Sequence, residues 1–562
     1  MDDFDDCAPC AAEGTSPAPK ERGHVNRRDF IRITALATTG AALAASLPSQ
    51  VFADDSEEIA DGLHLQEATI AQLQAAMASG RLSAQTLVDR YVDRIKRLDR
   101  GGPHVNSVLE VNPDAQDIAE QLDKERKEKG PRGPLHGIPI LLKDNVDTHD
   151  RMQTAAGSLA LVGTPAVRDA TVAARLRQAG AIILGKTTLS EWANFRSTHS
   201  SSGWSGRGQQ CRNPYVLDRN PCGSSSGSGA APSANFCAAS IGTETDGSIV
   251  CPATANGVVG IKPTLGLTSR AGVVPISHNQ DTVGPHGRTV ADAAAVLSAI
   301  AGGSDPRDPM ASGPVLDYTQ FLKKDGLKGA RIGVARTNGF GTSPKADAII
   351  EDAIKAIKDA GATVIDPANI PTQSKLGGQT ERTVLLFDFK QDLKAYLANR
   401  VGVPIKTLAD AIAFNEAHAS TELKWFGQEL FLLAEATTNL SDPVYTAALA
   451  LSHQLSREQG IDAVMSQFNL DALVAPTGSP AWTTDLVQGD HFTTASSTPA
   501  AQAGYPIVTV PAGFSFGLPV NISFIGRAFS EPTLIRLAFA FEQATKARRV
   551  PKFQATIPLP LP

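Results

Sequence analysis

The sequence predicts an α/β protein organised as a single large domain. Short apolar runs alternate with amphipathic segments along most of the chain, and Arg331–Ile365 reads as a strand, a helix and a second strand in succession. The 562 residues are 42% hydrophobic and 20% charged, which is ordinary for a globular protein with a substantial core. Neither an internal repeat nor a second break in composition marks a further domain.

The expected elements follow from local patterns. A helix begins after Ser83, whose side chain can cap it, and carries apolar residues at helical spacing from Leu87 to Leu98. The other helices are expected at Pro113–Lys129, Ala170–Ala179, Asp281–Gly302, Ser343–Gly361, Thr383–Leu397, Leu408–Leu433 and Thr533–Ala547. Strands are expected at Val105–Val111, Ile138–Leu142, Ala181–Leu184, Arg331–Ala335, Ala362–Ile365, Asp471–Pro476, Pro506–Pro511 and Val520–Ile525.

The first 53 residues are typical of a twin-arginine signal peptide. Arg27 and Arg28 precede an apolar run, and small residues at Val51–Ala53 stand at the usual cleavage spacing. That run is too short to span a bilayer. We therefore expect residues 1–53 to be a signal peptide, 54–62 an acidic linker and 63–555 the main domain, exported to the periplasm or secreted.

Charge and composition limit the partners. The formal net charge is −6, and acids and bases are mixed along the chain with no basic run suited to a phosphate backbone. We therefore expect no nucleic acid partner, no membrane span and a monomer that acts on a small molecule or peptide.

The sequence leaves open whether the cysteines form disulfides. Cys7 and Cys10 lie upstream of the twin arginines and would be removed with the signal. The remaining four surround one glycine-rich stretch: Cys211, Cys222, Cys237 and Cys251. Export permits disulfides, but the sequence does not determine whether these cysteines pair, and it favours buried packing thiols.

That stretch, Asn220–Thr264, is the candidate core of an active site. It places Gly, Ser, Ala and Thr in two turns, Cys222–Gly229 and Thr243–Ile249, with few large side chains. Such turns let backbone amides approach a ligand closely. Each turn offers a serine, Ser224 in the first and Ser248 in the second.

Lys143 is the candidate base. It directly follows the buried strand run Ile138–Leu142, at the point where the chain leaves the core. Burial is the means by which a lysine becomes a neutral base near pH 7. Lowering its pKa from about 10.4 to about 7 costs roughly 4–5 kcal/mol, which a large domain can absorb.

Other motifs and other interpretations of the serines have to be weighed. Gly180–Thr187 matches the P-loop pattern, but its variable positions form an apolar strand run after a helix, so nucleotide binding is disfavoured. Gly223–Gly227 matches the GxSxG elbow, yet the preceding residues are polar and the available histidines, His278, His286 and His453, have no distinctive context. The serines could also be ordinary turn residues.

Several motifs together resemble the amidase signature family across essentially the whole mature chain. They are GIPILLKDNVDT around Lys143, PCGSSSGSG around Ser224 and GTETDGSIVCPATANGVVGIKPT around Ser248. Within that family the likeness is to bacterial peptide amidases, through GPLHGIPILLKDN, LGKTTLSEWANFR, SGWSGRGQQ and IGTETDGSIVCPA. The resemblance implies one α/β domain with a mixed central β-sheet covered by helices.

The resemblance also implies a Ser–Ser–Lys triad. Ser248 matches the nucleophile, Ser224 the bridging serine held by a cis peptide, and Lys143 the base. Ser225 would support Lys143 by a hydrogen bond. An oxyanion hole is expected from the backbone N–H groups of Thr245, Asp246, Gly247 and Ser248.

Elementary chemistry agrees with these roles. A serine hydroxyl is too weakly acidic to attack an amide unaided, so it needs a base within hydrogen-bond reach. A lysine acting through a second hydroxyl can take that proton and return one to the leaving nitrogen. The scheme needs no metal or cofactor, and the mature chain carries no HExxH motif or clustered His/Cys ligand spacing.

Two positions depart from the family pattern. Many relatives have Gly-Gly-Ser where this chain has Asp246-Gly247-Ser248, and Gly-Gly where Cys222 precedes Gly223. Neither change removes a reacting atom. Asp246 could bear on substrate choice or on the electrostatics of the lysine.

The sequence therefore predicts an exported, cofactor-free amidase that hydrolyses a carboxamide through an acyl-enzyme, most plausibly the C-terminal amide of a peptide, with release of ammonia. The alternatives are a broad aryl or aliphatic acylamidase, the subunit of a tRNA-dependent amidotransferase, and a non-catalytic binding protein on the same scaffold.

Overall fold

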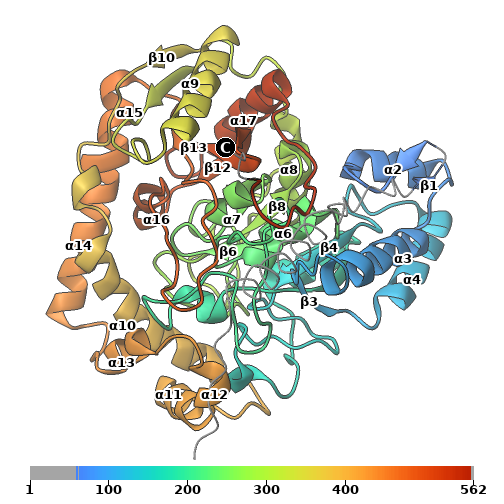
Figure 1. Ribbon diagram of the computed structural model, residues 1–562, viewed down its shortest axis with the longest axis horizontal. Coiled ribbons are helices and arrows are strands. Elements are labelled where there is room, and N and C mark those ends of the chain that lie inside the picture. The colour runs from blue at the N-terminus through green and yellow to red at the C-terminus, as the bar shows by residue number, and fades with distance from the viewer. Residues whose placement is uncertain (1–57, 61, 559–562) are drawn as a thin grey trace, which may run out of the picture. The chain divides into compact units, whose positions relative to one another are not determined.

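An 11-stranded mixed β-sheet runs through the protein in the computed structural model, which describes residues 58–60 and 62–558 (Figure 1). The strand order is β10-β9-β11-β13-β12-β7-β8-β6-β4-β5-β3. The strands are β3 (Val108–Val111), β4 (Pro139–Lys143), β5 (Ile182–Thr187), β6 (Ala239–Glu244), β7 (Val259–Lys262), β8 (Thr282–Gly287), β9 (Arg331–Val334), β10 (Thr363–Ile365), β11 (Ala472–Pro476), β12 (Ile507–Ser515) and β13 (Leu518–Ile525).

Both pairing types occur in this sheet. β4 is parallel to β5 on one side and to β6 on the other, and β9 is parallel to β10 and β11. The remaining neighbours, including β6 with β8 and β12 with β13, are antiparallel. The expected mixed α/β sheet is therefore confirmed.

The helices cover this sheet. They are α2 (Ile70–Ala78), α3 (Ala84–Arg94), α4 (Ala115–Lys129), α5 (Thr171–Gln178), α6 (Ser226–Ser233), α7 (Val250–Ala255), α8 (Val290–Ile300), α9 (Pro344–Asp359), α10 (Gly378–Leu397), α11 (Leu408–Ala417), α12 (Ala419–Glu422), α13 (Glu429–Glu435), α14 (Pro443–Ser456), α15 (Asp462–Phe468), α16 (Thr498–Ala503) and α17 (Glu531–Thr545). Figure 1 shows α3 and α4 near β3, while α10 and α14 lie well away from them. Every helix among the described residues is too short or too polar to cross a lipid bilayer.

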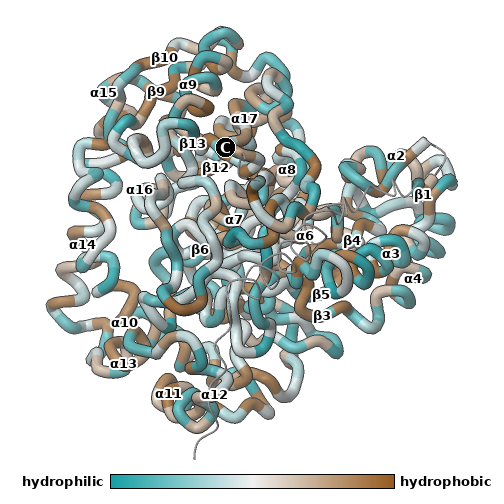
Figure 2. The backbone as a smooth tube through the Cα atoms, in the orientation of Figure 1, coloured by the Kyte–Doolittle hydropathy of each residue, from teal (hydrophilic) through white to brown (hydrophobic). Residues whose placement is uncertain are grey.

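Central strands are apolar because both faces are covered. All residues of β4, PILLK, are buried, and all of β5 and β6 as well. In Figure 2 the region of β4 and β5 is hydrophobic, whereas α4 is largely hydrophilic. Lys143 and Lys186, the lysines on these two strands, are fully buried.

Some predicted elements need correction. Asp281–Gly302 was expected to be one helix, but Thr282–Gly287 forms β8, which pairs with β6 and β7, before Thr289 caps α8. Leu408–Leu433 is divided into α11, α12 and α13. In the expected linker 54–62, Glu58–Ala60 forms β1, which pairs with β2 (Leu63–His64).

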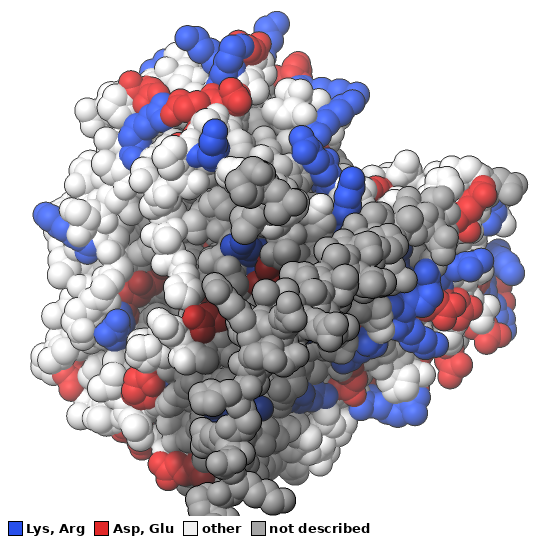
Figure 3. Space-filling model, in the orientation of Figure 1, with Lys and Arg blue, Asp and Glu red and all other residues white. Residues whose placement is uncertain are grey.

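The signal peptide expected at residues 1–53 lies outside the described residues. On the described part of the face in Figure 3, basic and acidic side chains are interspersed. This agrees with the mixed charge pattern of the sequence.

Candidate active site

Lys143 lies at the carboxyl end of β4, where the strand leaves the sheet. Its side chain is fully buried, and its Nζ donates hydrogen bonds to Ser224 Oγ at 2.8 Å and Thr243 Oγ1 at 2.8 Å. The carbonyl of Thr243, 3.3 Å from Nζ, accepts a third. The parallel pairing of β4 with β6 explains why Thr243 reaches the lysine. The sequence predicts Lys143 and Ser224 in one site, and the structure brings them into contact.

Burial lowers the pKa of Lys143 to about 7, although the negative charges of Asp281 and Glu244 act in the opposite direction. A lysine with this pKa is largely neutral slightly above pH 7 and can then accept a proton. Sequence reasoning anticipated this burial but missed Thr243, Asp281 and Glu244. The order of strands in a sheet is not a local property of the sequence, so no nearby pattern pointed to them.

Ser224 is fully buried in the turn before α6, and the peptide bond Gly223–Ser224 is cis. A side chain at Gly223 would displace the Ser190 hydroxyl, because its Cβ would lie 2.2 Å from Ser190 Oγ. The first turn is fixed at both ends: Ser190 N–H donates to the Ser224 carbonyl at 3.0 Å, and Ser226 Oγ donates to the Cys222 carbonyl at 2.6 Å.

Ser225 differs from its expected role. Its Oγ donates to the Thr243 carbonyl at 3.0 Å and accepts from the Thr243 N–H at 3.2 Å. No hydrogen bond joins Ser225 to Lys143 in the described chain. Ser225 therefore acts on the lysine only indirectly. It holds the backbone of Thr243, the residue whose carbonyl and hydroxyl both accept hydrogen bonds from Lys143 Nζ.

Ser248 lies in the second turn, immediately before α7, and is 9% exposed. Gly247 has φ +81°, a left-handed conformation that favours glycine. The Glu244 carboxylate holds the far side of this turn by accepting from the N–H groups of Ile249 at 2.7 Å and Val250 at 3.0 Å. The two turns are joined directly, because Ser225 N–H donates to the Ser248 carbonyl at 3.3 Å.

The amides expected to form an oxyanion hole are those of Thr245, Asp246, Gly247 and Ser248. In the described part of the chain, none of the last three donates a hydrogen bond to another residue. The Thr245 hydroxyl donates to Asp281 at 2.6 Å, which anchors the start of the turn. The amides of Asp246, Gly247 and Ser248 therefore take no part in holding this turn in place.

A disulfide between Cys222 and Cys251 links the two turns, with Cα atoms 5.9 Å apart. The preference for packing thiols was wrong for this pair, although Cys211 and Cys237 are free and buried. The disulfide forms because the fold brings the two turns that carry Cys222 and Cys251 close together. The sequence alone does not reveal that proximity.

Both turns line a cavity of about 480 Å³. Gly223, Asp246, Gly247 and Ser248 face it, with Cys222 and Cys251. Its walls carry the apolar side chains Phe195, Ile276, Leu385, Leu430, Trp482 and Phe492. Its charged lining residues, among those described, are the acids Asp246 and Asp490. The cavity can thus accommodate an apolar body with its polar end at Ser248.

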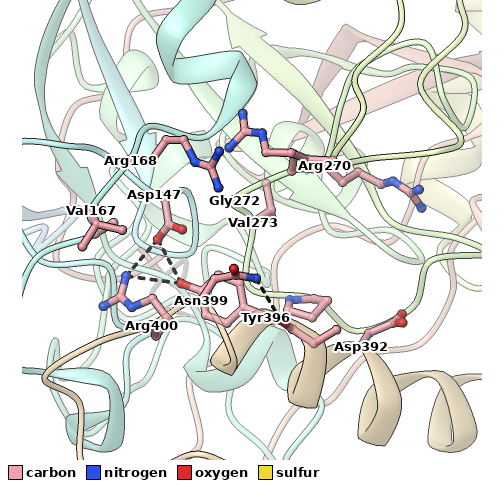
Figure 4. Close-up of a pocket in the computed structure, with 15 residues that line it drawn as sticks. Asp147, Val167, Arg168, Arg270, Gly272, Val273, Asp392, Tyr396, Asn399 and Arg400 are labelled. Atoms are coloured by element: carbon pink, nitrogen blue, oxygen red, sulfur yellow. Dashed lines mark hydrogen bonds and ion pairs between the residues drawn. The ribbon is translucent and has the colours of Figure 1, made fainter.

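A second cavity, of about 450 Å³, lies elsewhere and is lined by several arginines (Figure 4). Arg400 forms an ion pair with Asp147 at 2.9 Å, and Arg270 forms one with Asp308. Asp147 also accepts from the Tyr396 hydroxyl at 2.9 Å. Because most of its charges are compensated in pairs, this cavity is not an evident ligand site.

The competing motifs do not form sites. Gly180–Thr187 is the end of a helix–strand unit, with Ile182–Thr187 forming β5, as the rejection of a P-loop predicted. His286 is buried and bonds to the Ile249 carbonyl at 2.9 Å, and burial lowers its pKa to about 4. His278 is paired with Asp392 instead. The serine of the GxSxG match is Ser225, and its hydroxyl bonds the Thr243 backbone, with no hydrogen bond to a histidine among the described residues, so the Ser–His pair of an elbow is not formed.

Comparison with known proteins adds an independent finding. The family model described as amidase matches residues 86–535. A probable amidase of Arabidopsis thaliana is 47% identical over 503 residues, covering 87% of this chain and 92% of the relative. A glutamyl-tRNA(Gln) amidotransferase subunit of Exiguobacterium sibiricum is 35% identical, covering 87% of this chain and all of the relative.

A solved structure is also similar. The native peptide amidase from Stenotrophomonas maltophilia is 50% identical, with a TM-score of 0.82, and the match covers 87% of this chain and 99% of that one. Most of the chain therefore has a counterpart of known structure.

Proposed function

This chain belongs to the amidase family, and on that premise we propose that it is a serine hydrolase that removes the C-terminal amide of peptides as ammonia. One observation carries the proposal: Lys143 Nζ lies 2.8 Å from Ser224 Oγ, beside a turn that presents Ser248 to a cavity. The likeness to a peptide amidase supports this choice of substrate.

The proposed reaction begins with neutral Lys143. It takes the Ser224 proton while Ser224 takes the proton of Ser248, whose Oγ attacks the carbonyl carbon of the amide. The carbonyl oxygen becomes an oxyanion, and the C–N bond breaks as a proton passes back through Ser224 to the leaving nitrogen. Ammonia leaves, and an acyl group remains on Ser248. Water, activated by the same relay, then releases the carboxylic acid.

The oxyanion would be stabilised by the backbone N–H groups of Asp246, Gly247 and Ser248. These amides have no other described acceptor, so they are available to a developing charge. Each such donor contributes roughly 3–4 kcal/mol in comparable sites. Gly247 permits the left-handed backbone that points them inward.

The cavity supports a peptide substrate rather than a small aliphatic amide. Its volume of about 480 Å³ falls in the range of sites that bury most of a drug-sized ligand. The apolar wall formed by Phe195, Leu385 and Trp482 offers contact area for side chains preceding the amide.

The tests distinguish this proposal from three alternatives. An acylamidase would hydrolyse anilides at least as well as peptide amides. An amidotransferase component, the role named for the 35% identical relative, would need partner subunits and tRNA. A non-catalytic binding protein would show no turnover at all.

The discriminating experiment measures ammonia release by the purified chain from a panel of peptide amides and, in parallel, aniline release from matched anilides. We expect turnover of peptide amides by the chain alone, and at least 10³-fold less in Ser248→Ala, since removal of a triad nucleophile abolishes most catalysis. Preference for anilides would support the acylamidase. Unchanged turnover in Ser248→Ala would contradict the proposal.

We also propose that residues 1–53 direct export through the twin-arginine route and that the enzyme is a periplasmic or secreted monomer. The Cys222–Cys251 disulfide is compatible with an oxidising compartment. Fractionation of cells that express the full chain, with Arg27 and Arg28 replaced by lysine as the control, tests export.

A further inference from the structure

Asp246 occupies the position two residues before the proposed nucleophile and lines the same cavity. Its carboxylate accepts hydrogen bonds from Ser497 Oγ at 2.5 Å and from Thr498 Oγ1 at 2.7 Å. Ser497 and Thr498 begin α16. The nucleophile turn is thereby tied to a helix that is distant in sequence, without use of its backbone amides.

Glu381, in the first turn of α10, is the second carboxyl group of this cluster. It accepts from Gln280 Nε2 at 2.9 Å, and the same amide donates to the Thr245 carbonyl at 3.3 Å. Burial, followed by the charge of Asp246, raises the pKa of Glu381 to about 8. At neutral pH Glu381 is therefore largely protonated. Burial raises the pKa of Asp246 as well, but the hydrogen bonds from Ser497 and Thr498 act in the opposite direction, so Asp246 is the member of the pair that is favoured as a carboxylate.

The charged side chains that line the cavity, among the described residues, are all acidic. Its lining includes Asp246 and Asp490 and, among the described residues, contains no lysine, arginine or histidine. Behind the turn, burial lowers the pKa of Lys262 to about 8, and the nearby acids Glu244, Glu531 and Asp246 act in the opposite direction. The charged side chains that a substrate at Ser248 meets on the cavity wall are therefore acidic.

We propose that Asp246 is a positioning and specificity-determining residue that fixes the nucleophile turn and disfavours substrates carrying a carboxylate beside the scissile carboxamide. The proposal rests on the function proposed above. The Asp246 carboxylate would select neutral or cationic peptide amides. It would also favour departure of the product, because hydrolysis converts a neutral carboxamide into a carboxylate at the same place.

The test compares two nearly isosteric probes, the α-amides of N-acetylglutamate and of its γ-methyl ester. Both contain the same scissile amide, and only the first carries a carboxylate beside it. We expect wild-type enzyme to have a kcat/KM at least tenfold higher for the ester, and Asp246→Asn to reduce this ratio at least tenfold, equivalent to about 1.4 kcal/mol. Asp246→Asn retains an acceptor oxygen for one of the two hydroxyls.

Two further variants separate the effect of the Asp246 charge from the effect of anchoring the nucleophile turn. Ser497→Ala removes an anchor but leaves the charge, so it should slow both probes and preserve their ratio. Asp490→Asn removes the other acid of the cavity and should change the ratio less than Asp246→Asn does. A change equal to or larger than that of Asp246→Asn would overturn the assignment.

The wild-type enzyme alone can also overturn it. If the acid and the ester are hydrolysed within about threefold of each other, Asp246 exerts no charge selection, even should Asp246→Asn fail to fold. Turnover of the ester with equal turnover of the acid defeats this inference but leaves the proposed function standing. Failure to release ammonia from either probe contradicts the proposed function and the inference with it.

Discussion

At the scale of single residues, the central feature is a lysine placed where water is excluded. Lys143 is fully buried, and its hydrogen-bond partners are the hydroxyls of Ser224 and Thr243 and the carbonyl of Thr243. None of these is a carboxylate in direct contact. The lysine is thus held by groups that accept a hydrogen bond from either its charged or its neutral form, which favours proton transfer.

The first prediction concerns the pH dependence of catalysis. The base must be neutral, and burial lowers the pKa of Lys143 to about 7, so kcat/KM should rise with pH and level off above about pH 7–8. The profile of kcat/KM reports groups of the free enzyme. A stopped ammonia assay from pH 5 to 9 with a neutral peptide amide measures it. An acid limb centred below pH 5 would indicate a carboxylate base instead.

The second prediction concerns stability. The pKa of Lys143 is lowered from 10.5 to about 7 on folding, so the unfolded chain binds the additional proton between these values. Below about pH 7 the lysine destabilises the fold by roughly 4–5 kcal/mol, and the penalty shrinks as pH rises towards 10. Lys143→Met should therefore be inactive yet more stable than wild type, most clearly below pH 7.

Denaturant unfolding of both proteins from pH 6 to 9 measures this difference. The gap in unfolding free energy should narrow as pH increases. A gap that is independent of pH would show that the pKa of Lys143 is not depressed in the folded protein.

At the scale of elements, the site depends on two strands and two turns that meet only in the folded protein. β4 brings Lys143, β6 brings Thr243, and the turns before α6 and α7 bring Ser224 and Ser248. The Cys222–Cys251 disulfide and the bond from Ser225 N–H to the Ser248 carbonyl hold these turns together.

The third prediction follows from that linkage. The disulfide closes a loop with a sequence separation of 29 residues, and such bridges typically contribute about 2–4 kcal/mol. Replacing Cys222 and Cys251 together by serine should lower Tm and reduce kcat/KM, because the two turns are then free to separate. Thermal unfolding and ammonia release measure both effects.

Treatment with a reductant is the matched control. It should lower the Tm and kcat/KM of the wild-type enzyme towards the values of the double variant, and it should leave both values of the double variant unchanged. Cys237→Ser, which alters a free buried thiol, should respond to reductant as wild type does. Full activity in the double variant would show that packing alone holds the turns.

Local patterns are sufficient for some elements. The apolar run before Lys143 predicts β4, and the cap at Ser83 predicts α3, because both signals are contained in a few adjacent residues. The helix expected to include Thr282–Gly287 is wrong there, because this segment, TVGPHG, contains Pro285 and two glycines, which disfavour a helix, and it pairs with β6 and β7 as a strand.

The candidate site is predictable in part for the same reason. Ser224, Ser248 and Lys143 stand within recognisable motifs. Thr243, Glu381 and Ser497 contribute through contacts between segments far apart in the chain. No spacing in the sequence encodes those contacts, which explains why Ser225 was expected to bond Lys143 directly, whereas Thr243 lies between them.

At the scale of the whole molecule, a single sheet carries the strands that bring the parts of the site together. β6 and β4 are adjacent near one end of the strand order, while the hydroxyls that anchor Asp246 of the nucleophile turn, those of Ser497 and Thr498, stand at the start of α16, which follows β11 in the chain. The proposed triad, the turn amides and the cavity all belong to this one chain. This is why we expect turnover without a partner protein.

The measurement that tests the proposed mechanism most directly is mass spectrometry of the enzyme quenched during hydrolysis of an N-acetyl peptide p-nitrophenyl ester, which acylates the same nucleophile. The acyl mass should appear on the proteolytic fragment that contains Ser248, and should be lost in Ser248→Ala and strongly reduced in Lys143→Met. Acylation of Ser224 instead, or equal labelling of Ser248→Ala, would contradict a relay that ends at Ser248.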